Sequence, residues 1–170
     1  MIDPAYVRTM ARYARWQNDN LYSAADTLSE EARHQDRGAF FKSIHATLNH
    51  LLWADTMWMS RSSDFPQPTV GLSGSASYFN DWEALKRERA AMDRRIVDWA
   101  RAIGVAELAG DLAWRSSTNT DFVKPRWLVI THMFNHQTHH RGQAHAMITA
   151  AGATPYITDL VIMPGCTYSI

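Results

Sequence analysis

The sequence lacks the features that mark secreted and membrane proteins. Its 170 residues contain a single cysteine, Cys166, so no disulfide can form within the chain. No hydrophobic run approaches the roughly 20 residues that a membrane-spanning helix needs. The first residues show no charged segment followed by an apolar one, which is the pattern of a signal peptide. A lone cysteine fits a reducing compartment, and we expect a cytoplasmic protein with no membrane partner.

The sequence also lacks an excess of either charge. Seventeen basic residues balance seventeen acidic ones, and only three of the basic residues are lysines. The basic residues are scattered along the chain and form no block or stripe. Because nucleic-acid-binding domains normally carry a concentrated basic patch, we expect no nucleic-acid partner.

Apolar residues are abundant enough for a folded core. Hydrophobic residues make up 46% of the chain and charged residues 20%, a balance typical of globular proteins rather than disordered ones. A chain of this length can bury a substantial core in one unit. We therefore predict a single domain over residues 1–170.

Apolar residues recur every three or four positions along four segments, which is the pattern of amphipathic helices. The first segment opens with Asp3-Pro4, a pair suited to the N-cap and the first helical position. The third is the most regular, and it is followed by Gly104, a residue favoured just past a helix end. The predicted helices cover residues 4–29, 41–61, 82–103 and 125–151.

The connections between these helices complete the predicted architecture. Residues 62–76 are rich in serine, glycine and proline, which suits a long loop from the second helix to the third. Residues 105–124 fit a short β-hairpin or an irregular loop. We predict an all-α four-helix bundle with a long crossover between helices two and three. The apolar tail, residues 157–164, is expected to pack on the bundle or on a partner chain.

Four of the eight histidines fall within nine residues of the predicted fourth helix. His136 and His140 are four residues apart, so their imidazoles share one face of the helix and can bind one metal ion. His132 and His136 have the same spacing, and that pair stays open as an alternative. A third ligand has to come from another helix. His50 is the candidate, because it lies on an apolar line of the second helix.

Several other polar or aromatic residues are candidates to support this site or to line its pocket. They are His139, His132, Asn18, Tyr13 and Trp53. Arg89 interrupts the apolar face of the third helix, and we expect its head group to reach solvent. His45 lies off the apolar line of the second helix and is expected either to be partly exposed or to support a metal ligand. The competing interpretation of the histidines, and of His50 above all, is that they are hydrogen-bonded core residues.

Three segments carry distinctive motifs. They are residues 13–18 (Tyr-Ala-Arg-Trp-Gln-Asn), residues 43–55 (Ser-Ile-His-Ala-Thr-Leu-Asn-His-Leu-Leu-Trp-Ala-Asp) and residues 135–143 (Asn-His-Gln-Thr-His-His-Arg-Gly-Gln). In these motifs, and over nearly the whole chain, the sequence resembles the DinB-like (damage-inducible) family of metal-binding four-helix bundles. The resemblance implies a metal triad formed by His50, His136 and His140. It also implies an up-down-down-up order of helix directions and a homodimer.

The same resemblance implies a kind of chemistry. Characterised members of the family include transferases and isomerases that use a low-molecular-weight thiol. Our first hypothesis is therefore a divalent-metal-dependent enzyme, with Zn, Ni, Fe or Mn, that adds or exchanges such a thiol on a small-molecule electrophile. The alternatives are a metal-dependent hydrolase and a non-catalytic metal-binding dimer of the stress response. No residue is assigned a catalytic role beyond the metal ligands.

Overall fold

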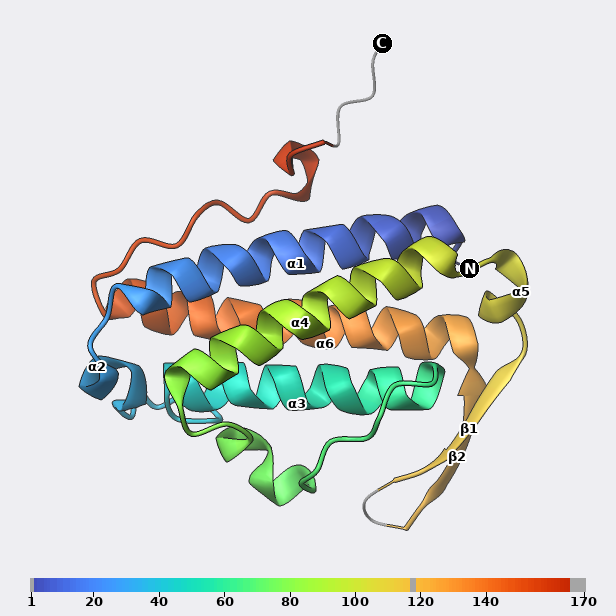
Figure 1. Cartoon of the computed structure of the whole chain (residues 1–170), viewed down its shortest axis with the longest axis horizontal. Helices are drawn as coiled ribbons and strands as arrows, with labels where there is room; N and C mark the ends of the chain where they lie inside the picture. Colours follow the sequence, from blue (N-terminus) through green and yellow to red (C-terminus); the bar gives the residue numbers. More distant parts are fainter. Residues whose placement is uncertain (1, 117–118, 166–170) are drawn as a thin grey trace.

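The computed structural model describes residues 2–116 and 119–165, and within them the chain is mostly helical. Figure 1 shows four long helices, which are α1 (Pro4–Asp26), α3 (Ile44–Ser62), α4 (Trp82–Ala102) and α6 (Arg126–Ala150). The shorter elements are α2 (Glu30–His34), the 3-10 helix η1 (Leu72–Ser77), α5 (Val105–Leu108), strands β1 (Asp111–Arg115) and β2 (Asp121–Pro125), and the 3-10 helix η2 (Leu160–Ile162). The predicted helical class is confirmed, and a short hairpin precedes the last long helix.

The first three long helices begin where a polar side chain can cap them. The caps are Asp3 for α1, Ser43 for α3 and Asp81 for α4, and each accepts a hydrogen bond from the backbone amide three residues later. Such a bond satisfies one of the amides that has no partner within the helix. The cap at Ser43 explains why α3 begins three residues later than the periodicity predicts.

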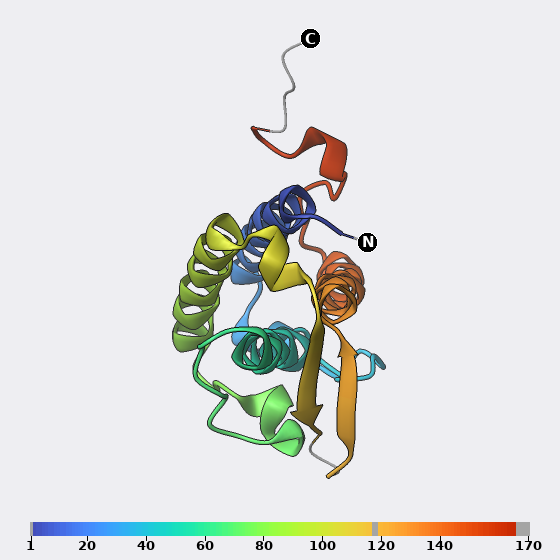
Figure 2. The ribbon, with the colours of Figure 1, turned by 90° about the vertical axis from the view of Figure 1, so that its right-hand side faces the viewer.

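The four long helices pack around one core. α1 contacts α4 and α6, and α3 contacts the same two helices. α1 and α6 run in one direction and α3 and α4 in the other (Figure 1), while Figure 2 shows the four closer to end-on. Each contributes fully buried apolar side chains, among them Val7, Leu48, Leu85 and Phe134. Among the described helices, none combines the length and the apolar character needed to cross a bilayer.

Both long connections lie against α3. The crossover between α3 and α4 contains η1, which packs on α3 and shortens the predicted loop. The hairpin pairs β1 with β2 in antiparallel register and sets Trp114 opposite Phe122. Their rings stack with centroids 5.2 Å apart. Strand β1 also contacts α3 and α6, so the hairpin stands beside these two helices.

Two expectations about polar side chains are wrong. Arg89 does not reach solvent: it is 2% exposed, and its guanidinium pairs with Asp55 at 2.6 Å and with Asp93 at 2.8 Å. An arginine can be buried there because two carboxylates offset the cost of removing its charge from water. His45 is 3% exposed, because α2 covers it and the ring of His34 stacks on it at 4.2 Å.

The chain after α6 folds back along α1. The hydroxyl of Tyr13 donates a hydrogen bond to the carbonyl of Thr158 at 2.6 Å, and the amide of Gln17 donates to the carbonyl of Ile157 at 3.2 Å. The described part of the tail therefore packs on a helix of its own chain. Cys166 lies outside the described residues.

Candidate metal centre

α3 and α6 lie against each other with three histidines at their interface. His50 projects from α3, and His136 and His140 project from α6. One ring nitrogen of each lies within 4.8 Å of the other two. The ring centroids are 4.3 Å apart for His136 and His140, 4.8 Å for His50 and His140, and 5.4 Å for His50 and His136. The structure thus brings together the three histidines that the sequence singles out, and their cluster could hold a metal ion.

The two histidines of α6 approach each other through their Nε2 atoms, which are 3.1 Å apart. Two nitrogens bound to one tetrahedral ion at ~2.0 Å would be separated by about 3.3 Å. The four-residue spacing produces this approach, because residues one turn apart share a helix face. The alternative pair is wider: the rings of His132 and His136 are 5.8 Å apart, and His132 is not part of the cluster.

Hydrogen bonds at Nδ1 orient two of the three rings. The Nδ1 of His50 lies 2.9 Å from the hydroxyl of Ser75, and the Nδ1 of His140 donates to the side-chain oxygen of Gln143 at 2.8 Å. A neutral imidazole that donates from Nδ1 keeps the lone pair on Nε2. Histidines that bind metals are commonly held in this way. The ring of His140 is therefore oriented to offer Nε2 to an ion, and the ring of His50 does the same when its Nδ1 donates to Ser75.

Burial keeps the three imidazoles neutral. Burial, together with a smaller effect of nearby histidines, lowers the pKa of His50 to about 4 and the pKa of His136 to about 3. Burial also lowers the pKa of His140, although the hydrogen bond to Gln143 acts in the opposite direction. Near neutral pH all three rings are uncharged, which is the form that binds a metal.

A comparison with known families identifies the chain. The sequence profile of the DinB family matches residues 1–167. The chain belongs to the DinB family. No curated protein matches it. The match includes α3 and α6, so family membership and the histidine cluster concern the same part of the molecule.

Aromatic rings surround the cluster of this DinB protein. Phe41 stacks on His50 with centroids 4.0 Å apart and lies 5.5 Å from the ring of His140. Trp53 lies 5.9 Å from His50, and its indole donates a hydrogen bond to the carbonyl of Val70 at 2.8 Å. These rings keep water away from His50, which is the physical cause of its lowered pKa.

Two further histidines flank the cluster on α6. The ring of His132 is 5.8 Å from that of His136, and the ring of His139 is 4.9 Å from that of His140. Both are exposed. His132 and His139 thus lie beside the candidate ligands. That they help to hold a ligand or a bound water stays a prediction.

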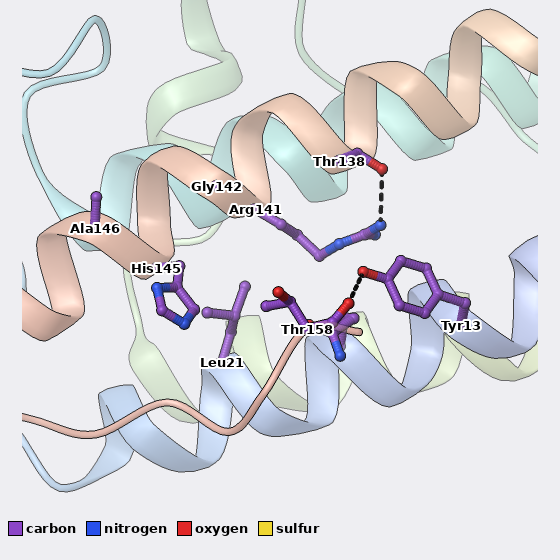
Figure 3. Close-up of a pocket in the computed structure, with 9 residues that line it drawn as sticks. Tyr13, Leu21, Thr138, Arg141, Gly142, His145, Ala146 and Thr158 are labelled. Atoms are coloured by element: carbon purple, nitrogen blue, oxygen red, sulfur yellow. Dashed lines mark hydrogen bonds between the residues drawn. The ribbon is translucent and has the colours of Figure 1, made fainter. Parts of the chain in front are cut away.

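Two of the pocket candidates lie elsewhere in the DinB fold. Asn18 is buried, and its amide donates to Asp93 at 2.9 Å, because α1 packs against α4 at this level. Tyr13 lines a separate cavity of about 280 Å³ between α1, α6 and the tail. Figure 3 shows Tyr13 there beside Arg141. The structure therefore brings neither Asn18 nor Tyr13 to the three histidines.

The residues that orient the rings were not predicted from the sequence. Gln143 follows His140 by three positions, so helical spacing offers a signal that could have identified it. Ser75 belongs to η1 and is 25 positions from His50, and no local pattern connects them. The packing of η1 on α3 is what brings the hydroxyl to the ring.

A buried group of polar side chains lies beside the candidate site, and one of its members, Gln137, follows His136 directly in the sequence. Gln137, the residue after a candidate ligand, donates to Asp55 at 3.0 Å across the α3–α6 interface. Asp55 in turn pairs with Arg89, which pairs with Asp93 on α4. These bonds join three helices, so they help to hold the two ligand-bearing helices in register.

Proposed function

We propose that this DinB protein binds a divalent metal ion through His50, His136 and His140 and uses it in catalysis. The observation that carries the proposal is the convergence of three neutral imidazoles from two helices within 4.8 Å. The donor set fits Zn, Ni, Fe or Mn, because three nitrogen ligands leave further coordination positions for a substrate. The likeness to the family supports a single domain with the up-down-down-up bundle topology.

We further propose that the protein is a transferase or isomerase that uses a low-molecular-weight thiol and acts on a small electrophile. A bound divalent ion would lower the pKa of such a thiol and stabilise its anion. The single cysteine of the chain, Cys166, lies outside the described residues, and we assign the reacting thiol to a small molecule from solution. Within the described residues the cluster includes no carboxylate that could serve as a general base, which places hydrolysis second.

Metal content tests the site itself. We expect the purified protein to hold about one equivalent of metal by elemental analysis, and the variants His50→Ala and His136→Ala to lose it. His145→Ala is the matched control, since it removes another half-buried histidine of α6 outside the cluster. Equal metal content in all four proteins would reject the site.

Activity tests the reaction class. Metal-loaded and metal-free protein would be assayed against a panel of small electrophiles with glutathione, bacillithiol or mycothiol. We expect turnover that requires both metal and thiol. Turnover that persists without any thiol would indicate hydrolysis instead. No turnover above the metal-free protein would favour the non-catalytic metal-binding role.

The family likeness also supports a cytoplasmic homodimer, which we propose as the biological unit. Sedimentation velocity at micromolar concentration measures this directly. A single species with the mass of one chain would contradict it.

A further inference from the structure

The hairpin lies beside α3 and α6 (Figure 2). A second hollow is lined by residues of these three elements. It has a volume of about 340 Å³, and we call it the aromatic cleft. Its lining includes Trp58 from α3, Trp114, Phe122 and Lys124 from the hairpin, and Val129 and His132 from α6. Trp114 stacks on Phe122 at 5.2 Å and meets Trp58 edge-on at 5.9 Å. Flat apolar walls of this kind suit a planar apolar ligand.

Two cations border this cleft: Lys124 lines it, and Arg61 lies outside the lining but over two of its rings. The guanidinium of Arg61 lies 4.6 Å from the ring centre of Trp58 and 5.7 Å from that of Trp114. In the part of the chain that the structure describes, no carboxylate pairs with Arg61, and partial burial lowers its pKa. Lys124 adds a second cation, and no lining residue is acidic. An anionic group on the ligand would supply the missing partner.

His132 lines the cleft and is also a neighbour of the candidate metal centre. The ring of His132 is 4.7 Å from that of Trp58 on one side and 5.8 Å from that of His136 on the other. Val129, His132 and His136 follow each other at helical spacing along α6. A molecule against His132 would therefore lie about one helical turn from His136.

We propose that the aromatic cleft binds a flat apolar small molecule that carries an anionic group, such as an aromatic carboxylate. The ring packs between Trp58, Trp114 and Phe122, and the anionic group pairs with Arg61. That this molecule is the electrophilic substrate rests on the proposed function. Its binding does not, because the residues that hold it are separate from the three histidines.

Calorimetric titration of 2-naphthoate into protein stripped of metal with EDTA tests the binding. The uncharged 2-naphthamide has the same ring system and is the matched ligand. We expect wild-type protein to bind 2-naphthoate about tenfold more tightly than 2-naphthamide, because a charge-assisted hydrogen bond is worth about one decade of affinity. Equal affinity for the two ligands, or no binding of either, would overturn the proposal.

Variants assign the binding to the cleft. Arg61→Leu should weaken 2-naphthoate about tenfold and leave 2-naphthamide nearly unchanged, and Trp114→Ala should weaken both ligands. Arg95→Leu is the control, since Arg95 also lies over an aromatic ring, at 4.1 Å from the centre of Phe65 on another part of the surface. Unchanged binding of 2-naphthoate to Arg61→Leu would overturn the proposal even if the other variants fold poorly.

Two further measurements separate the competing explanations. In protein loaded with Mn²⁺, the proton signals of bound 2-naphthoate should broaden, and they should stay sharp with His136→Ala. Binding without broadening would overturn the assignment of the cleft as a substrate site.

If 2-naphthoate fails to bind and Trp114→Ala turns a dimer into a monomer, the cleft is an interface between two copies and the proposal is rejected. If only the metal assays fail, the proposed function is rejected, while the titrations of metal-free protein still test whether the cleft binds its ligand.

Discussion

The buried charged side chains of this protein stabilise one another by compensating each other's charge. Arg89 is 2% exposed and donates to the carboxylates of Asp55 and Asp93, and Asn18 also donates to Asp93. Removing one charged member of such a group leaves buried charge without its counter-ion, which costs more than the pair contributes. The buried cluster is therefore a sensitive point for the stability of the whole helical core.

We expect Arg89→Met to lower the free energy of unfolding by about 3–5 kcal/mol, because two buried carboxylates lose their counter-ion. Chemical denaturation followed by circular dichroism measures the change. Arg87→Met is the control on the same helix, since the side chain of Arg87 is 68% exposed and its loss should change stability by less than ~0.5 kcal/mol. Similar unfolding midpoints for the two variants would show that the buried charges are not coupled as described.

A single histidine outside the candidate site should affect stability at acid pH. Burial lowers the pKa of His45 to about 4, whereas an unfolded histidine has a pKa near 6.5. Between these values the unfolded chain binds a proton that the folded chain does not. The free energy of unfolding of wild-type protein should therefore fall, relative to His45→Gln, by up to about 1.4 kcal/mol per pH unit as the pH decreases from 6.5 toward 4.

The measurement is urea unfolding of both proteins in EDTA at several pH values, so that bound metal does not contribute. The two proteins differ only at residue 45, so the difference between their curves reports the ring of His45 and its contact with His34. Parallel curves over this range would mean that His45 is protonated in the folded state.

At the level of elements, the crossover does more than connect two helices. Its 3-10 helix η1 packs on α3 and supplies Ser75, which is 1% exposed and meets Nδ1 of His50. A residue of the connecting segment therefore orients a histidine of a long helix. The hairpin also contributes side chains, because its strands bring Trp114 and Phe122 to the surface of α3 and α6.

If Ser75 orients His50 for a metal, Ser75→Ala should weaken metal affinity by about 10–100-fold, the usual effect of losing a partner of a ligand histidine. Competition with a chromogenic chelator measures the affinity. Ser73→Ala is the control, because Ser73 is an exposed residue of the same 3-10 helix. Equal affinities of the two variants would indicate that the hydroxyl has no such role.

At the level of the whole molecule, a metal ion would link α3 to α6 across the core. These helices are separated in sequence by the crossover, α4 and the hairpin, so the link would join the two halves of the chain. An ion that binds the folded state and not the unfolded one stabilises the fold by mass action. Metal binding should consequently be visible as resistance to heat.

We expect Zn²⁺ at one hundred times its dissociation constant to raise the unfolding midpoint by ~5–10 °C, and EDTA to reverse the shift. Differential scanning calorimetry measures it. His140→Ala should show no shift, whereas His145→Ala should behave like wild type. A shift that survives in His140→Ala would place the bound ion elsewhere.

The long helices and the pair His136 and His140 could be predicted because each depends on residues close together in the sequence. A hairpin was one of the two expectations for residues 105–124. Helical periodicity located all four long helices, and the spacing of His136 and His140 follows from one turn of α6. His50 was the candidate for the third ligand because it lies on an apolar line of the second helix, and the family resemblance implied the same residue. Helix ends were less accurate where a cap such as Ser43 overrides the apolar pattern.

Other features were decided only by the tertiary structure. Whether Arg89 faces water depends on which carboxylates pack over it, and whether Ser75 meets His50 depends on how the crossover lies on α3. The aromatic cleft likewise exists only because the hairpin folds against two helices. Burial and pairing depend on residues brought together from distant parts of the chain, so they cannot be predicted from local spacing.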